Sequence, residues 1–272
     1  MTSYGKDLEM GKTKGFDKYF YYRKSVQAPK EDAKFLGRVY KDAYNKKAET
    51  MREDFCAAFA LSCAWVQGGA ERKALGVDLD PEPLNYGREN YLPKLKPDQR
   101  SRVEVYEDNV LNASLPKVDI ISAMNFSYMI FKTRANLLQY LETCHNNLKE
   151  QAVLVMDCFG GAGVMEPNIE ETKHEDFSYF WEQDSYNPVT NEALFHIHFK
   201  RKGEKKRKRV FTYDWRLWSL AELKDLMLEA GFHKVSIYWE GTGADGDGNG
   251  IYRRTEKGDD SVAWVSYIVG SK

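Results

Sequence analysis

Apolar positions along the chain change their spacing several times, and each change marks an expected element. Between residues 31 and 47 they recur at the spacing of one helical face, which predicts a helix there. Residues 57–66 are apolar almost all round, so a helix over them must be buried, and we expect it against a sheet. A later apolar stripe follows Thr133, and a capping box at Ser219 and Glu222 opens the last expected helix.

Short apolar runs alternate with these helices in the first half of the chain. The runs that we expect to be strands of a parallel sheet are residues 51–56, 74–78, 103–106, 118–123 and 152–158. This alternation of strands and helices is typical of a doubly wound α/β fold. The second half differs, because residues 194–200 and 209–215 alternate like a hairpin around a basic turn. The last two expected strands are 235–239 and 262–269.

Composition and charge narrow the class of protein. The chain is 42% hydrophobic and 30% charged, as globular proteins are. Forty basic residues against forty-one acidic ones give a net charge of -1, so no global field draws the chain toward nucleic acid or a membrane. The first thirty residues lack the apolar stretch of a secretory signal, and no apolar run is long enough for a bilayer. Four cysteines in apolar segments favour reduced thiols, so we expect a cytoplasmic protein, with a nuclear location as the alternative.

Acidic residues stand at the expected carboxyl ends of the first three strands. They are Glu53 with Asp54, then Asp78, then Asp108. Ligands of a doubly wound sheet bind outside these strand ends. A carboxylate after the second strand can accept hydrogen bonds from both ribose hydroxyls, and one after the third can accept from the adenine amino group. The order of the acids therefore predicts a nucleoside site.

Several segments resemble class I methyltransferases, which use S-adenosylmethionine. The segments that carry the likeness are Arg52 to Ala57 (REDFCA), Leu75 to Pro81 (LGVDLDP), Glu107 with Asp108, and Glu229 to Phe232 (EAGF). The chain is more closely similar to a bacterial-type branch whose first motif is EDFCGT. Residues 22–29, the NFSY segment at 125–128 and the YDWRLW segment at 213–218 also resemble that branch. The likeness extends over residues 17–269.

The resemblance implies a Rossmann-like, doubly wound, seven-stranded sheet with an antiparallel last strand and S-adenosylmethionine across its first strands. It assigns cofactor contacts to Glu53, Phe55, Cys56, Ala57, Asp78, Leu79, Asp108, Asn109 and Asn125. In this assignment the turn after the first strand passes beside the methionine part, and the acid after the second strand holds the ribose. Leu79 packs on adenine, the pair after the third strand meets the adenine edge, and Asn125 lies near the sulfonium methyl.

The same resemblance implies a single methyltransferase domain over residues 1–272. We expect its parts to be a helical N-terminal cap (1–50), the cofactor-binding core (51–158), an acceptor-side insert containing the hairpin (159–218), and a C-terminal helix with two strands (219–272). The cap and the insert are expected to close over the acceptor. The predicted reaction is in-line methyl transfer to a small-molecule or amine acceptor, which needs alignment and exclusion of water rather than a fixed nucleophile.

One departure from the family pattern concerns the turn after the first strand. The family has glycine there, because the backbone passes close to the cofactor without a Cβ. This chain has Ala57 and Ala58 in place of the Gly and Thr of the EDFCGT branch, and Phe59 follows. The alternative hypothesis is therefore a non-catalytic binding protein on the methyltransferase fold. A nicotinamide dehydrogenase is disfavoured, because no GxGxxG motif follows the strand.

Asn125 and Tyr128 are candidates for positioning the acceptor. They keep the N-x-x-Y spacing of the NPPY-type loop of amino methyltransferases, although both prolines are missing. In that loop the asparagine accepts a hydrogen bond from the amine and the aromatic ring stacks on the acceptor. The alternative, which we favour, is a polar loop that only closes the cofactor pocket.

Three further motifs have ordinary structural explanations. The basic turn at 200–209 is compatible with an RNA or protein methyltransferase, but we favour a solvated hairpin tip. His196 and His198 point to one side of a strand and offer a base or a metal pair, and a structural role is favoured. Residues 245–256 fit a calcium-loop pattern, yet the expected flanks are strands, so no metal is predicted. The sequence does not predict the oligomeric state.

Overall fold

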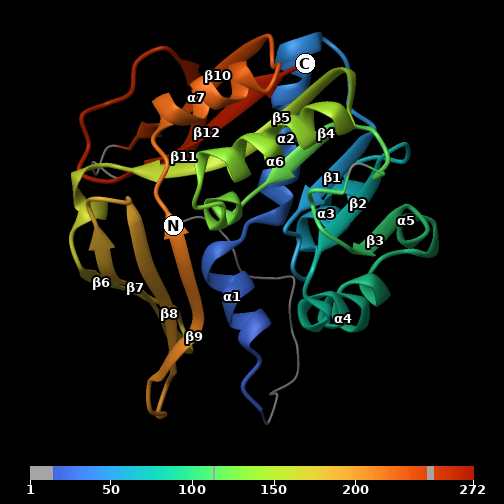
Figure 1. Ribbon diagram of the computed structural model, residues 1–272. Coiled ribbons are helices and arrows are strands. Elements are labelled where there is room, and N and C mark those ends of the chain that lie inside the picture. Colours follow the sequence, from blue (N-terminus) through green and yellow to red (C-terminus); the bar gives the residue numbers. More distant parts are fainter. Residues whose placement is uncertain (1–14, 113, 244–247) are drawn as a thin grey trace.

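A large mixed sheet and a smaller antiparallel sheet lie side by side in the computed structural model (Figure 1). The structure describes residues 15–112, 114–243 and 248–272. The strands of the large sheet are β1 (Thr50–Asp54), β2 (Lys73–Asp78), β3 (Val103–Glu107), β4 (Val118–Ala123), β5 (Leu148–Gly160), β10 (Lys234–Thr242), β11 (Gly248–Thr255) and β12 (Trp264–Ser271). Their order is β11-β10-β12-β5-β4-β1-β2-β3.

The large sheet confirms the predicted doubly wound topology. Strands β1 to β5 are mutually parallel, and the strand order reverses between β1 and β4. The last strand, β12, runs antiparallel to both β5 and β10, as expected. One strand of this sheet was not expected: β11 adds an eighth strand at the edge, between the last two strands that the sequence predicts.

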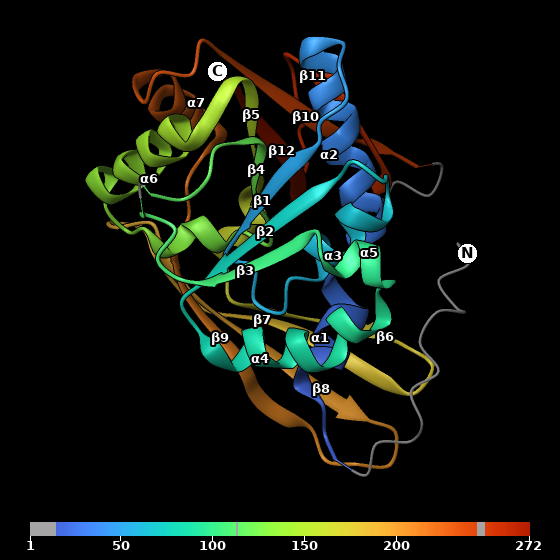
Figure 2. The same cartoon turned by 90° about the vertical axis from the view of Figure 1, so that its right-hand side faces the viewer.

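Helices cover both faces of the large sheet, which Figure 2 shows nearly edge-on. One face carries α2 (Pro29–Tyr44) and α3 (Ala60–Gln67), and the other carries α6 (Arg134–Asn147) and α7 (Leu220–Glu229). Each face has its own large hydrophobic cluster. Other helices are α4 (Pro81–Asn90), η1 (Leu92–Lys94), α5 (Pro97–Arg100), η2 (Ser127–Ile130) and η3 (Ala162–Met165).

The predicted helices form with shifted ends, and left-handed residues explain the shifts. Helix α2 ends three residues before the predicted position because Asn45 adopts φ 53° and interrupts it. Helix α3 was expected from residue 57 but starts at Ala60, since both Ala57 and Phe59 have positive φ. The apolar character of α3 was predicted correctly, because all of its residues except Gln67 are buried.

The predicted hairpin is the centre of a four-stranded antiparallel sheet in the order β6-β7-β8-β9. Its strands are β6 (Asn168–Lys173), β7 (Phe177–Asn187), β8 (Glu192–Arg201) and β9 (Arg207–Arg216). Only the last two were expected. Helix α1 (Lys18–Val26) lies between this second sheet and α4 of the core, where Figures 1 and 2 agree in placing it.

Candidate functional site

The turn between β1 and α3 has an unusual backbone. Phe55, Ala57 and Phe59 all adopt left-handed conformations, with φ values of 56°, 45° and 48°. Left-handed backbone costs roughly 1–2 kcal/mol for each residue that has a Cβ. The chain therefore forms, without any glycine, the shape that alternating glycines would give to this turn. Strain of this kind is found mainly at ligand sites, where the surrounding structure holds it in place.

Contacts with β2 and α4 hold the turn in this shape. The backbone N–H of Ala57 donates to Oδ2 of Asp78 at 2.7 Å, and Oδ1 of Asp78 accepts from the N–H of Asp80 at 2.9 Å. The ring of Phe59 is fully buried against Gly87, where a Cβ would collide with it. Glycine at position 87 thus makes room for the phenylalanine that follows Ala58.

Glu53 faces the start of α3 rather than the surface. One of its oxygens, Oε2, accepts from the backbone N–H of Ser62 at 2.7 Å and from its hydroxyl at 2.6 Å. Burial raises the pKa of Glu53 to about 7, and the hydrogen bonds from Ser62 oppose the rise. Glu53 therefore connects the end of β1 to the first turns of α3.

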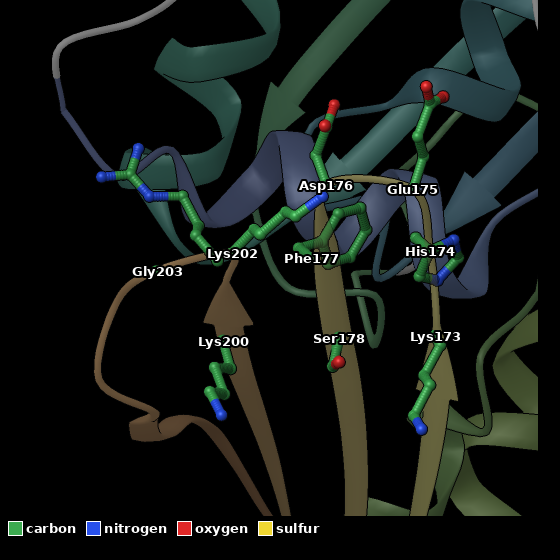
Figure 3. Close-up of a pocket in the computed structure, with 10 residues that line it drawn as sticks. Lys173, His174, Glu175, Asp176, Phe177, Ser178, Lys200, Lys202 and Gly203 are labelled. Atoms are coloured by element: carbon green, nitrogen blue, oxygen red, sulfur yellow. The ribbon is translucent and has the colours of Figure 1, made fainter.

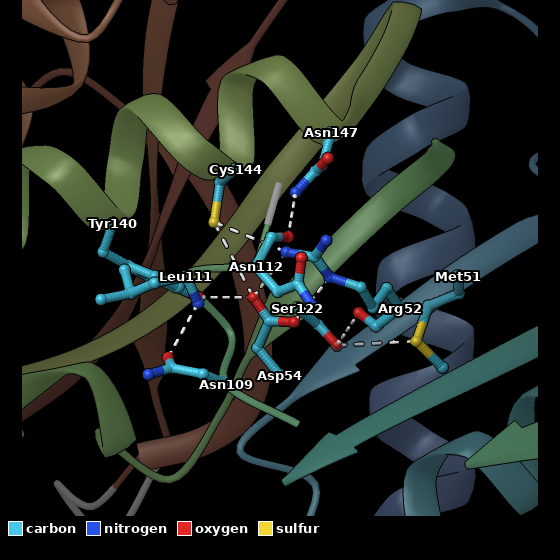
Figure 4. Close-up of polar contacts among 10 residues, drawn as sticks. All are labelled: Met51, Arg52, Asp54, Asn109, Leu111, Asn112, Ser122, Tyr140, Cys144 and Asn147. Carbon is cyan, nitrogen blue, oxygen red and sulfur yellow. Dashed lines mark hydrogen bonds and ion pairs between the residues drawn. The ribbon is translucent and has the colours of Figure 1, made fainter. Parts of the chain in front are cut away.

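Asp54 points to the opposite face of the sheet, where it belongs to a buried network (Figure 4). Its two oxygens accept from Nε and Nη2 of Arg52 at 2.6 and 2.9 Å, and Oδ2 also accepts from the hydroxyl of Tyr140 at 2.9 Å. Cys144 lies 3.8 Å from the same oxygen. The network connects β1 to α6 directly beneath the turn, so it supports the site from the core.

The ends of β2 and β3 bring the predicted nucleoside-binding residues together. The N–H of Asp108 donates to the carbonyl oxygen of Asp78 at 3.0 Å. Asp108 is half-buried and accepts from the N–H of Asn109 and the side chain of Asn112. Beside them Leu79 is 65% exposed, an apolar side chain in water at the place where the prediction has it packing on adenine.

The loop after β4 contains the predicted acceptor residue Asn125 and an acid that sequence reasoning missed. Asn125 and Phe126 are both left-handed, and their N–H groups donate to Oδ2 and Oδ1 of Asp157 at 2.7 and 2.8 Å. Asp157 is only 8% exposed, and burial raises its pKa to about 7. It follows the pattern of the other acids, an acid near the carboxyl end of a strand, and that pattern could have identified it.

Tyr128, the second predicted acceptor residue, faces the core. Its side chain is fully buried in the hydrophobic cluster on the α6 face, so it has no surface for an acceptor. The half-buried ring of this loop is that of Phe126 instead. It lies 4.6 Å from the ring of Phe159 and 6.2 Å from that of Trp215, measured between centroids.

The inner face of the second sheet is an aromatic wall, which we define by the rings of Trp181, Phe195, Tyr213 and Trp215. Neighbouring centroids are 4.5 to 5.6 Å apart along this row. Through the contact of Trp215 with Phe126, the wall begins at the loop after β4. An aromatic surface thus adjoins the predicted cofactor site.

Helix α1 contacts both the aromatic sheet and the core. On the core side, Asp17 accepts from the hydroxyl of Tyr86 at 2.7 Å, and Lys18 pairs with Glu82 at 2.7 Å. On the other side, Tyr22 lies 5.0 Å from Phe211 of β9, between ring centroids. The helix therefore bridges the two sheets next to the site.

His196 and His198 lie on the opposite face of β8 from the aromatic wall and are bonded locally. Nδ1 of His196 lies 2.9 Å from the hydroxyl of Thr212. Nε2 of His198 lies 2.7 Å from Glu182, while its Nδ1 accepts from the N–H of Arg209 at 2.7 Å. Both rings are 2% exposed, so they are structural parts of the sheet.

The basic turn lies at the end of the second sheet that points away from the core (Figure 1). Lys206 packs over the ring of Phe180 at 3.6 Å, and Arg207 packs over Phe16 at 4.7 Å. An open pocket beside the turn mixes basic and acidic side chains (Figure 3): Lys173, His174, Lys200 and Lys202 with Glu175 and Asp176. Part of the basic charge is thus used within the sheet itself.

The first half of the calcium-loop pattern, residues 245 and 247, lies outside the described residues. Asn249 and Gly250 belong to β11, where the N–H of Gly250 donates to Glu240 at 2.7 Å. Across the described ranges, no group of three or more His, Cys, Asp or Glu is placed to hold a metal ion. In the same ranges no helix has the length and apolarity to cross a membrane.

Comparison with solved structures identifies the fold. A S-adenosylmethionine-dependent methyltransferase from Clostridium acetobutylicum aligns with a TM-score of 0.66 at 16% identity, over 93% of this chain and 96% of that one. The chain has the class I methyltransferase fold. The sequence matches no protein-family model and no curated protein.

Two further structures align over most of the methyltransferase fold. The methyltransferase CcbJ from Streptomyces caelestis gives a TM-score of 0.66 at 16% identity, over 90% of this chain and 95% of that one. The sugar N-methyltransferase KedS8 from Streptoalloteichus gives 0.62 at 16% identity, over 100% and 99% of the two chains. At these identities the likeness establishes the fold, and the EDFCGT branch stays a prediction from the sequence.

Proposed function

We propose that the protein is an S-adenosylmethionine-dependent methyltransferase that acts in line on a small-molecule or amine acceptor. The observation that carries the proposal is the left-handed turn at Phe55, Ala57 and Phe59, tied to Asp78 within a methyltransferase fold. A turn that had lost its ligand would have no reason to keep three strained residues. The strain therefore favours a retained cofactor site over a purely structural turn.

The residues at the strand ends fit the cofactor. A carboxylate has about four lone-pair sites, so Asp78 can accept from ribose hydroxyls while it keeps its bonds to Ala57 and Asp80. In our proposal the exposed side chain of Leu79 packs on the adenine ring, and Asp108 and Asn109 meet the edge of that ring. The neighbouring structures of CalS10 and MtfA were determined with bound S-adenosylmethionine.

The cofactor, when bound, supplies an electrophilic methyl group on a sulfonium. The protein then has to orient the acceptor and exclude water, which accounts for catalysis without a fixed nucleophile. In our proposal the turn passes beside the methionine part, and Asn125 lies near the methyl. We do not assign acceptor contact to Tyr128, because its side chain is fully buried.

The test is thermal unfolding with S-adenosylmethionine, with S-adenosylhomocysteine and with NADH. A ligand at about one hundred times its Kd stabilises the folded state by roughly 2.7 kcal/mol, which for a chain of this size raises Tm by roughly 2–4 °C per kcal/mol. We expect this shift with the two sulfur nucleosides only. Asp78→Ala should abolish it, and Asp98→Ala, which removes an exposed acid of α5, should leave it unchanged.

A non-catalytic binding protein is the rival function, motivated by Ala57 and Ala58. It predicts the same thermal shift but no S-adenosylhomocysteine release with any acceptor. Absence of any shift in the wild-type protein would contradict cofactor binding itself. Turnover with one amine or hydroxyl compound would exclude the rival.

A further inference from the structure

Asp32 and Asp157 form what we call the acidic wall, at the carboxyl edge of the large sheet. Asp157 and Tyr267 are directly paired in the register between β5 and β12, so their side chains share one face of the sheet. Phe35 of α2 packs on Tyr267 with ring centroids 4.2 Å apart. Asp32 lies one helical turn before Phe35, on the same side of α2. The contact of Phe35 therefore positions Asp32 over the strand end that carries Asp157.

The carboxylates of the acidic wall face one another's negative charge. Burial raises the pKa of both Asp32 and Asp157 to about 7, and the charge of Asp32 contributes to the rise at Asp157 and at Glu53. The salt bridges between described residues include none of these three carboxylates. Because a buried carboxylate without a cation is costly, the wall is complementary to a positive charge that the described residues do not provide.

The aromatic wall of the second sheet meets the acidic wall at Phe126, whose N–H donates to Asp157 at 2.8 Å and whose ring lies 6.2 Å from that of Trp215. The charge of Asp157 adds to the effect of burial in raising the pKa of Tyr22 to about 12, and the neighbouring hydroxyl of Tyr213 opposes the rise. The side chains of Tyr22, Tyr213 and Trp181 are all partly buried. Partly buried aromatic rings beside carboxylates form a surface that suits an apolar ligand with a positive charge.

We propose that the region where the two walls meet binds the methyl acceptor as a small molecule carrying an ammonium group, which lies on Asp157 and Asp32 while an apolar or planar body lies against the aromatic wall. The proposal rests on the proposed methyl transfer and names its substrate class. Charge complementarity selects the amine over a neutral acceptor, and the rings add cation–π attraction. The loop that contains Asn125 is bonded to Asp157, so the ammonium would lie next to the predicted methyl position.

The acidic wall also gives the amine a route to its reactive form. The bound ammonium transfers one proton to a carboxylate of the wall, whose raised pKa of about 7 lies closer to that of an ammonium than the pKa of an ordinary carboxylate does. The free lone pair of nitrogen then forms the new C–N bond while the methyl C–S bond breaks. The bonding pair of that bond stays on sulfur, so the products are a methylated ammonium and a neutral thioether.

The test uses two probes of equal size, 2-phenylethylamine and 2-phenylethanol, titrated into protein saturated with S-adenosylhomocysteine. Binding is followed by the tryptophan fluorescence of the protein, to which Trp181 and Trp215 of the aromatic wall contribute. We expect the amine to have a Kd at least ten-fold lower than the alcohol. Asp32→Asn should remove most of this preference and leave the Kd of the alcohol and of S-adenosylhomocysteine unchanged. Glu31→Gln, the neighbouring exposed acid of the same helix, is the matched control and should change nothing.

Each other outcome overturns the inference in a recognisable way. Equal Kd values for the two probes, with S-adenosylhomocysteine bound, would refute amine recognition and leave the cofactor site intact. If Asp32→Asn weakens S-adenosylhomocysteine but not the amine, Asp32 serves the ammonium of the cofactor instead. If S-adenosylhomocysteine gives no thermal shift in the wild-type protein, the proposed function fails first and the acceptor proposal falls with it. Trp181→Leu should weaken the binding of both probes equally, so that the contribution of the aromatic wall can be distinguished from that of the acidic wall.

Discussion

The side chains of Arg52 and Asp54 are both fully removed from water, so each depends on the other for its charge to be tolerated. Removing one partner of a buried ion pair leaves an uncompensated charge and costs about 3–5 kcal/mol. We therefore expect Asp54→Ala to lower the free energy of unfolding by that amount, measured by urea denaturation. The exposed pair of Lys34 and Glu31 is the control, since Glu31→Gln should change stability by less than about 0.5 kcal/mol. Equal effects of the two variants would show that the Arg52–Asp54 pair is not buried in solution.

The raised pKa of Glu53 makes stability depend on pH in a defined direction. The folded value is about 7, above the ordinary value of 4.5, so between these two pH values the unfolded chain releases a proton that the folded chain keeps. The free energy of unfolding therefore falls as pH rises through this window. The fall amounts to about 1.4 kcal/mol for each unit by which the pKa is raised.

The variant Glu53→Gln isolates this effect, because glutamine does not titrate. We expect the stability of the wild type, relative to the variant, to decrease from pH 4.5 to pH 7 and to stay level above it. Urea denaturation at several pH values measures the difference. Curves for the two proteins that stay parallel across the window would contradict the raised pKa of Glu53.

At the scale of elements, the local backbone decides whether an alanine-to-glycine change raises or lowers the free energy of unfolding. The turn between β1 and α3 and the helix α3 allow this to be tested. Ala57→Gly removes the strain of a left-handed alanine, so it should keep or raise the free energy of unfolding, by up to about 1 kcal/mol. The same change in the regular helix α3, Ala64→Gly, should lower it by about 1 kcal/mol or more. Thermal and urea denaturation of both variants measure the two changes in the free energy of unfolding. A loss of stability in both would mean that Ala57 is not left-handed.

Most of the elements that the sequence predicts have a buried face, and β3 is an exception, because none of its residues is buried. Apolar residues recur at helical spacing in α2 and form continuous runs in β1, β2, β4 and β5. All five of these elements are present in the structure. Among the elements that were missed, three lack such a pattern. Helix α1 has no buried residue, β6 is exposed throughout, and β11 is rich in glycine and nearly all exposed. Local pattern cannot reveal an element that is held by contacts distant in the sequence.

The same distinction separates the predicted from the missed site residues. Asp78 and Asp108 could be found because each stands at the end of a short apolar strand. Asp32 could not, since its position over Asp157 depends on the packing of α2 against β12. The left-handed backbone of Phe55 and Phe59 was also unpredictable, because it appears at residues other than glycine. The prediction of Tyr128 at the acceptor followed motif spacing, which carries no information on burial.

The whole molecule consists of two sheets whose proposed ligand sites meet beside α1. This helix holds to the core through Asp17 with Tyr86 and to the second sheet through Tyr22, yet none of its residues is fully buried. Helices with few buried contacts open locally at low free energy. A ligand bound between the sheets adds a third set of contacts and should make this opening rarer.

We therefore expect S-adenosylhomocysteine to slow amide hydrogen exchange in residues 18–26 by ten-fold or more, while the amides of α7 that exchange by local opening keep their rates. Tyr86→Phe removes the hydrogen bond to Asp17 and should speed exchange in α1 without ligand. Ligand should then restore much of the protection, because its contacts do not involve that hydroxyl. A thermal shift without any protection of α1 would show that the cofactor binds without the helix, so that closure over the site depends on the acceptor alone.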